Sequence, residues 1–257
     1  MTETQRVLDG SVALVTGGSR GIGRRIAEVL GGAGAQVFLV ARDEGGLGDA
    51  TTALQHRGIE AASHAGSAAD PLEIDAAVVS CVEHFGRIDV LVNNAGIDTA
   101  TSLLDPDWAE IERLWQLNYF GPWHFIQAAW NASMRERGGS VINIASTAAA
   151  KARAIMAAYG MSKAALLDLT RRMAVEAGPG VRVNAIAPGI VATDMVRELF
   201  ATRGAPVGVG EDGTGPWPLR RAGTLDDVAQ AALYLASPAS GWITGQVLYV
   251  DGGANLP

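Results

Sequence analysis

The sequence predicts an α/β fold in which helices cover both faces of a parallel β-sheet. Three observations lead to this prediction: short apolar runs alternate with longer helical segments, a glycine-rich turn follows the first run, and no linker or repeat interrupts the pattern. The chain has 257 residues, of which 48% are hydrophobic, enough for an ample core. We therefore expect a single domain over residues 1–257.

The expected strands are short, apolar and rich in β-branched residues. They occupy residues 12–15, 36–41, 60–65, 88–92, 141–144, 181–187 and 246–250. The expected helices lie between them. They occupy residues 24–33, 71–85, 108–118, 120–137, 157–177 and 225–236.

Several of these helices begin at recognisable caps. Asp70 precedes Pro71 as an N-cap before a proline, and Thr224 with Asp227 forms a capping box. The Gly121-Pro122 pair predicts a break in the helix that precedes the fifth strand. The segment from about Ala201 to Gly215 holds five glycines, so we expect a mobile substrate loop at about 192–223.

The turn after the first strand reads Thr16-Gly17-Gly18-Ser19-Arg20-Gly21-Ile22-Gly23. Glycines allow the backbone to turn tightly and to approach a pyrophosphate, whose charge then meets the N-terminus of the next helix. A glycine triplet alone is weak evidence, but the order strand, glycine turn, helix makes it strong. We expect the dinucleotide to contact Gly17, Ser19, Arg20, Gly21, Ile22 and Gly23.

The end of the second strand bears on the choice of dinucleotide. An acidic residue there would bind the ribose hydroxyls of NAD, but this chain has Ala41 followed by Arg42. Arg42 and Arg20 together favour a 2′-phosphate, and hence NADP. NAD remains the alternative, because both arginines could be solvated and Asp43 adjoins Arg42.

Tyr159 and Lys163 are spaced to share one helix face, a turn apart. A lysine ammonium near a phenol favours the phenolate and lowers the tyrosine pKa, which suits proton transfer. Ser146 follows the fifth strand, at the edge where open α/β sheets bind ligands. Each feature is common by itself, so the interpretation rests on their combination.

Composition argues against several classes of protein. A net charge of −7 without a basic run speaks against a nucleic-acid or anionic-membrane partner, and no apolar run reaches the ~20 residues that span a bilayer. The single cysteine, Cys81, indicates a reducing compartment, so we expect a cytoplasmic protein. The four histidines show no ligand spacing, so we expect no metal site.

Together these motifs resemble the classical short-chain dehydrogenase/reductase family over nearly the whole chain, and in particular members of the 3-oxoacyl-acyl-carrier-protein reductase type. The resemblance rests on the glycine turn, on a fourth-strand motif, on a tetrad and on a proline-glycine segment. The matching residues beyond the turn are Asn93, Asn94, Ala95, Gly96, Asn118, Ser146, Tyr159, Lys163, Pro188, Gly189 and Thr193.

The resemblance implies a single-domain, doubly wound Rossmann fold with seven parallel strands, and hydride transfer between NAD(P) and a carbonyl/alcohol pair. Tyr159 would be the general acid or base, Ser146 would polarise the substrate oxygen, and Asn118 would place a water beside Lys163. Lys163 would also bind the nicotinamide ribose. Further cofactor contacts would come from Asn94, Ala95, Gly96, Pro188, Gly189 and Thr193.

The chain departs from the family beside the adenine, where an Asp is usual and Gly66 or Ser67 stands here. The resemblance also implies a homo-oligomer, a dimer or a tetramer. Trp115, Trp123 and Trp130 lie on helices that pack internally or form a subunit interface.

Substrate choice is the least determined property. For a pocket we weigh lining and core packing about evenly at Ile97, Met156, Met195, Leu199 and Trp217. The leading hypothesis is an NADP-dependent ketoreductase for a small-molecule ketone, either a 3-oxoacyl or another apolar one. The alternatives are an NAD-dependent alcohol or steroid-type dehydrogenase working oxidatively and, less favoured, a non-catalytic dinucleotide sensor.

Overall fold

The computed structural model describes residues 6–99, 101–151, 156–193, 196, 201, 210 and 215–256. Among these residues, seven strands form one sheet with the order β3-β2-β1-β4-β5-β6-β7. Each neighbouring pair is parallel. The strands are β1 (Val12–Thr16), β2 (Gln36–Ala41), β3 (Ala61–Ala65), β4 (Val90–Asn93), β5 (Gly139–Ile144), β6 (Val181–Pro188) and β7 (Val247–Val250). The predicted doubly wound Rossmann sheet is thereby confirmed.

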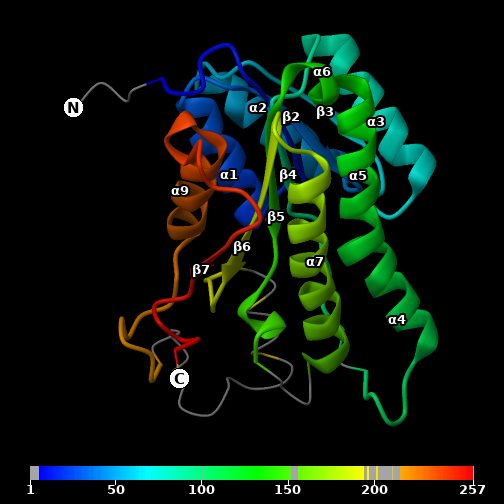
Figure 1. Ribbon diagram of the computed structural model, residues 1–257, viewed down its shortest axis with the longest axis vertical. Helices are drawn as coiled ribbons and strands as arrows, with labels where there is room; N and C mark the ends of the chain where they lie inside the picture. Colours follow the sequence, from blue (N-terminus) through cyan, green and yellow to red (C-terminus); the bar gives the residue numbers. More distant parts are fainter. Residues whose placement is uncertain are drawn as a thin grey trace.

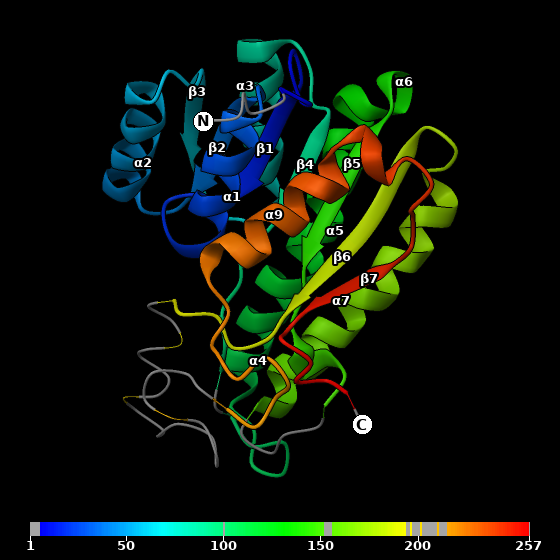
Figure 2. The ribbon, with the colours of Figure 1, turned by 90° about the vertical axis from the view of Figure 1, so that its left-hand side faces the viewer.

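Helices cover both faces of the sheet, as Figure 1 shows with the sheet nearly edge-on. One face carries α1 (Gly21–Gly32), α2 (Glu44–His56) and α9 (Leu225–Ala236). Figure 2 shows α1 and α9 in front of the strands and α2 beside β3 at the edge of the sheet. The other face carries α3 (Pro71–Phe85), α5 (Gly121–Ala129) and α7 (Ala157–Glu176). Each face has its own apolar cluster, so burial of both sides of the strands explains their nearly continuous apolar sequence.

The caps expected from the sequence are present. Asp70 accepts from the N–H groups of Leu72 and Glu73, and the Thr224–Asp227 capping box is complete. The helix α2 was not predicted from the sequence, although Asp43 caps it by accepting from the Gly46 N–H. Asp43 is therefore the N-cap residue of α2.

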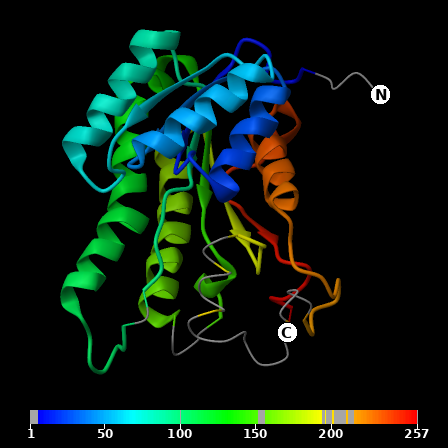
Figure 3. The same ribbon diagram turned by 180° about the vertical axis from the view of Figure 1, so that it is seen from behind.

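The predicted break at Gly121-Pro122 is wrong. The helix continues from α4 (Trp108–Trp115) through a π-helical segment (Gln116–Phe120) into α5, and the Gly121 N–H bonds to the Gln116 carbonyl. A second π-helical segment (Trp130–Met134) leads to α6 (Arg135–Arg137), and the whole helix is the long green one in Figures 1 and 3. The wider π turn accommodates Pro122, which has no N–H to donate, without interrupting the helix.

Within the described part of the chain, no helix has both the length and the apolar character needed to cross a bilayer.

Candidate active site

The glycine turn between β1 and α1 is closed by contacts that leave no room for side chains. Gly17 has a φ of +65°, and a Cβ added at Gly23 would lie 2.4 Å from the Gly17 carbonyl oxygen. A Cβ at Gly21 would meet no atom within 4 Å, so the backbone there borders open space. A closely packed turn with one open backbone position, at the start of a 12-residue helix, fits a dinucleotide pyrophosphate.

Thr16 joins this turn to the end of β4. Its hydroxyl oxygen accepts from the backbone N–H groups of Asn94 and Ala95, each at 3.0 Å. The side-chain amide of Asn94 donates to the Thr16 carbonyl at 2.9 Å. Thr16 was not among the predicted cofactor contacts. Its place at the head of the glycine motif was the available signal, since a threonine there can bond the neighbouring strand end.

The two arginines proposed for a 2′-phosphate are exposed near the ends of the first two strands. Arg20 is the N-cap residue of α1, and Arg42 follows β2 directly. Neither forms an ion pair with another described residue, whereas Arg25 on α1 pairs with Glu28 and Asp226. Their guanidinium groups are therefore not neutralised by a carboxylate of the described chain.

Asn118 lies buried in the π-helical segment and bonds to the connecting segment that follows β4. Its amide donates to the Ile97 carbonyl at 2.9 Å and to the Ser162 hydroxyl at 3.2 Å, while its oxygen accepts from the Ile97 N–H at 3.0 Å. The Ser162 hydroxyl donates in turn to the Tyr159 carbonyl at 2.7 Å. Asn118, Ile97 and the first turn of α7 are thus held as one unit.

Tyr159 and Lys163 share one face of α7, as predicted, and Ser146 reaches the same place from the end of β5. The Lys163 ammonium lies 5.8 Å from the centre of the Tyr159 ring and donates to the Ile144 carbonyl at 2.9 Å. The Ser146 hydroxyl hydrogen-bonds with Tyr159 and accepts from the Ala148 N–H at 3.1 Å. The structure therefore brings all four tetrad positions to one edge of the sheet.

The acid–base properties of this pair differ from the expectation. Burial raises the pKa of Tyr159 to about 12; the hydrogen bond with Ser146 lowers it and the Asp98 carboxylate raises it further. Burial also lowers the pKa of Lys163 to about 8. We expected the lysine to lower the pKa of the tyrosine, but in the protein chain desolvation of the phenolate is the larger effect.

The remaining predicted contacts lie on the segments that follow β1, β4 and β6. Gly96 approaches it so closely that an added Cβ would lie 3.1 Å from Asn118 Oδ1 and 3.3 Å from Lys163 Nζ. Gly189, after β6, donates to the Val250 carbonyl. The Thr193 hydroxyl accepts from the Val196 N–H at 3.2 Å. Ser19 and Ile22 are partly buried in the glycine turn, and Pro188 ends β6.

The proposed substrate-pocket residues are only partly described. Ile97 and Met156 are half-buried beside the tetrad segments, and Trp217 packs on Gly252 while donating to the Arg221 carbonyl at 2.8 Å. Met195 and Leu199 lie outside the described residues.

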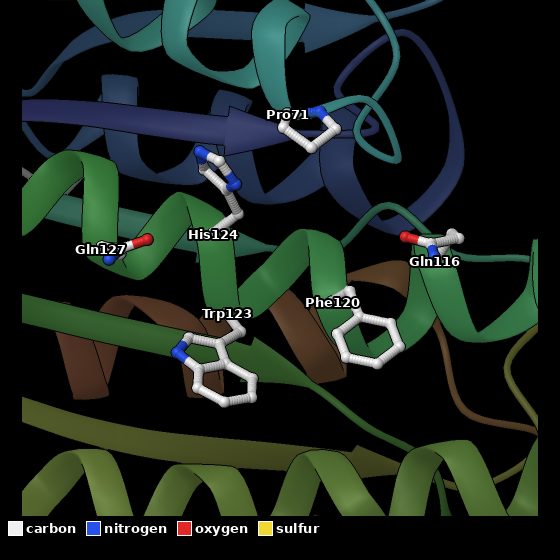
Figure 4. A pocket seen from close by; sticks show the side chains of 6 residues that line it. All are labelled: Pro71, Gln116, Phe120, Trp123, His124 and Gln127. Carbon is white, nitrogen blue, oxygen red and sulfur yellow. The ribbon is translucent and has the colours of Figure 1, made fainter.

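A cavity of about 280 Å³ lies on another part of the same long helix. Figure 4 shows its lining, which comes from the π segment, α5 and the first residue of α3; the residues are Pro71, Gln116, Phe120, Trp123, His124 and Gln127. His124 Nε2 lies 2.9 Å from Oδ1 of Asp75 on α3. None of the tetrad side chains lines this cavity, so we do not assign the reaction to it.

Comparison with known proteins agrees with this architecture. A family model described as Enoyl-(Acyl carrier protein) reductase matches residues 17–255. The chain is 40% identical to an uncharacterized oxidoreductase of Mycobacterium tuberculosis, with coverage of 97% of this chain and 94% of the relative. It is 35% identical to the 3-oxoacyl-acyl-carrier-protein reductase FabG of Vibrio cholerae, with coverage of 96% and 98%.

Two solved structures are similar over almost the whole chain. One is 7α-hydroxysteroid dehydrogenase complexed with NADH and 7-oxo glycochenodeoxycholic acid, with a TM-score of 0.90, 32% identity and coverage of 98% of this chain and 97% of that chain. The other is actinorhodin polyketide ketoreductase with NADPH, with a TM-score of 0.91, 32% identity and coverage of 96% and 98%. With the tetrad and the glycine turn on one sheet edge, these matches show that the chain belongs to the short-chain dehydrogenase/reductase family of oxidoreductases.

Proposed function

We propose that this protein is an NADP-dependent ketoreductase that reduces a small-molecule ketone to a secondary alcohol. The observation that carries the proposal is the grouping of side chains at one edge of the sheet, where the Tyr159 phenol hydrogen-bonds with Ser146 and the Lys163 ammonium lies 5.8 Å from the centre of its ring. A protonated phenol hydrogen-bonded to Ser146 is a proton donor ready for a developing alkoxide. Similarity to two ketoreductases supports the same direction.

The chemistry that a bound reduced nicotinamide would supply is a hydride for the carbonyl carbon. The residues of the chain would handle the oxygen. Ser146 donates a hydrogen bond to the carbonyl oxygen, and Tyr159 transfers its proton to that oxygen as the alkoxide forms. The Lys163 ammonium, 5.8 Å from the ring centre, stabilises the phenolate left behind.

The choice of NADP rests on Arg20 and Arg42. Both are exposed at the end of the sheet where the adenosine ribose would lie, and neither arginine pairs with a carboxylate among the described residues. Asp43, which adjoins Arg42 in the sequence, accepts from the Gly46 N–H as a helix cap. Two cations without an acidic competitor favour a 2′-phosphate over a free ribose hydroxyl.

Side-by-side calorimetric titrations with NADPH and NADH test the proposal, followed by a screen of ketones in the reductive direction. We expect tight binding of NADPH, weak binding of NADH, and turnover that requires Tyr159. NADH preference would redirect the screen to alcohol oxidation. Binding without turnover of any ketone or alcohol would favour the dinucleotide sensor.

An NAD-dependent dehydrogenase of alcohols or steroids is the second candidate. It is favoured by the similarity to a hydroxysteroid dehydrogenase whose structure contains NADH. The same residues would then act in reverse, with Tyr159 as the base.

We also propose that the protein forms a homo-oligomer through the long helix that carries Asn118. Phe120 and Trp123 are 45% and 42% exposed there, and Tyr119 packs edge-on against both. Such an aromatic cluster is more apolar than a solvated helix face needs to be. Sedimentation of the wild type and of Trp123→Glu tests this, since the charge should shift the oligomer to a smaller species.

A further inference from the structure

We propose that Ser162 is a positioning residue, which holds the Asn118 side chain and the backbone of Tyr159 in the arrangement that proton transfer requires. This role rests on the proposed ketoreductase function and adds to it a residue outside the tetrad. Ser162 is 0% exposed, so it acts through Asn118 and Tyr159 rather than on the substrate.

The Ser162 hydroxyl lies between the long helix and the first turn of α7. It donates to the Tyr159 carbonyl at 2.7 Å, and its oxygen accepts from the Asn118 side-chain amide at 3.2 Å. A hydroxyl has one hydrogen, so while that hydrogen is donated to Tyr159 the oxygen can only accept from Asn118. Among the described residues, the Asn118–Ser162 contact is the hydrogen bond that joins the long helix to α7.

The Asn118 amide depends on this hydroxyl because both of its hydrogens are used. One is donated to the Ile97 carbonyl at 2.9 Å and the other to Ser162, while the amide oxygen accepts from the Ile97 N–H at 3.0 Å. Asn118 is 0% exposed, like Ser162. Removing the hydroxyl therefore leaves a buried N–H of Asn118 without an acceptor and unfastens the long helix from α7.

The same contacts border the Lys163 ammonium. An added Cβ at Gly96 would lie 3.1 Å from Asn118 Oδ1 and 3.3 Å from Lys163 Nζ, so both atoms lie against the Gly96 backbone. Lys163 follows Ser162 directly and donates to the Ile144 carbonyl at 2.9 Å. Ser162 thus ties Asn118 to the helix turn that carries both the phenol and the ammonium. Such ties affect the rate, since a misplacement of about 1 Å can cost about a hundredfold.

A double-mutant cycle tests whether Ser162 acts through Asn118. Ser162→Ala should lower kcat for reduction of ethyl acetoacetate, a small 3-oxo ester, about tenfold. KM and the NADPH affinity measured by calorimetry should change less than about twofold, because Ser162 touches neither ligand. In an Asn118→Ala background the same substitution should change kcat less than about twofold, because the amide that Ser162 holds is already absent.

Two further variants separate the hydroxyl from the volume of the side chain. Ser162→Thr keeps the hydroxyl and should restore most of kcat. Ser162→Cys fills the space of the serine with a weaker acceptor and should give an intermediate kcat, so it carries the test if Ser162→Ala does not fold.

Ser133→Ala is the matched control. Ser133 is another buried serine of the long helix, and its hydroxyl accepts from the Ile88 N–H at 2.9 Å and donates to the Ile88 carbonyl at 3.3 Å. Ile88 precedes β4, so this bond lies at the opposite edge of the sheet from the tetrad. The control should lower the melting temperature as Ser162→Ala does, but leave kcat unchanged.

Hydrogen exchange supplies a readout without turnover. The Ile97 amide should exchange faster in Ser162→Ala than in the wild type, and at the wild-type rate in Ser133→Ala.

An equal loss of kcat from Ser162→Ala in the wild-type and Asn118→Ala backgrounds would overturn the positioning role. So would an equal loss of kcat in Ser133→Ala, since lower stability would then explain both variants. If the wild type does not reduce ethyl acetoacetate, unchanged exchange of the Ile97 amide in Ser162→Ala overturns it. Turnover that survives Tyr159→Phe would instead overturn the proposed function.

Discussion

The glycine turn and the tetrad lie on the same edge of the sheet, but they are built in opposite ways. The turn works by the absence of side chains: an added Cβ at Gly23 would lie 2.4 Å from both Gly17 O and Asn94 Nδ2. The tetrad works by side chains from three elements, each held by a specific hydrogen bond. Adding atoms should therefore damage the glycine turn, whereas removing side-chain atoms should damage the tetrad.

The largest effect is expected from removal of the Tyr159 phenol oxygen, which would carry the transferred proton. Tyr159→Phe removes the proton donor and leaves the ring, so ketone reduction should fall at least about a thousandfold. NADPH affinity measured by calorimetry should stay within a few-fold, because the glycine turn is untouched. Retained turnover would show that the tetrad is not the functional region.

Gly23→Ala tests the turn by adding a single methyl group. The new Cβ would overlap backbone and Asn94, so the turn must open and NADPH affinity should fall about a hundredfold. Gly32→Ala on the same helix is the control, since an added Cβ there meets nothing within 4 Å. Unchanged NADPH affinity in Gly23→Ala would contradict the assignment of this turn to the dinucleotide.

Lys163→Met tests how the burial of a tetrad side chain affects the stability of the protein. The folded pKa of Lys163 is about 8, below its ordinary value of 10.5, so the unfolded chain binds more protons between these values. Stability of the wild type should therefore rise with pH across that window. The variant should be the more stable protein at pH 7 by on the order of 2 kcal/mol, and the difference should vanish near pH 10.5.

Denaturant unfolding of both proteins at pH 7 and pH 9.5 measures this difference. Above pH 10 the raised pKa of Tyr159 acts in the other direction, because the unfolded chain loses the phenol proton first. Stability should then fall in both proteins. A wild type that is more stable than Lys163→Met at pH 7 would contradict the burial argument.

Arg42→Ala is expected to have the smallest effect. Loss of one exposed guanidinium should weaken NADPH binding about tenfold and leave NADH binding nearly unchanged. Arg172→Ala, an exposed arginine on α7, should change neither affinity. Equal losses for both dinucleotides would remove the argument for NADP.

Most of the fold could be predicted from the sequence because its signals are local. Alternation of apolar runs located all seven strands, and Asp70 and Thr224 marked two helix starts correctly. The helix over Glu44–His56 was overlooked, since its three glycines weaken the helical pattern while Asp43 caps it. The π-helical segment at Asn118 was mistaken for a break, because Gly121-Pro122 indicates interruption unless neighbouring turns adapt.

The identity of the site was predictable, but its electrostatics were not. Spacing places Tyr159 and Lys163 on one face, yet spacing does not tell how deeply each is buried, and burial sets both pKa values. The proximity of Asp98 to the phenol likewise depends on a connection whose path is fixed by Asn118. Such long-range contacts have no signature in a single sequence.

The bonds between Ile97 and Asn118 also have a consequence for hydrogen exchange. The Ile97 amide belongs to no strand or helix, yet it donates to the side chain of a buried residue that is anchored to α7 through Ser162. Its exchange with deuterium should therefore require opening of the long helix and α7 together. We expect this connecting-loop amide to exchange as slowly as those of the central strands, and Asn118→Ala to make it exchange fast.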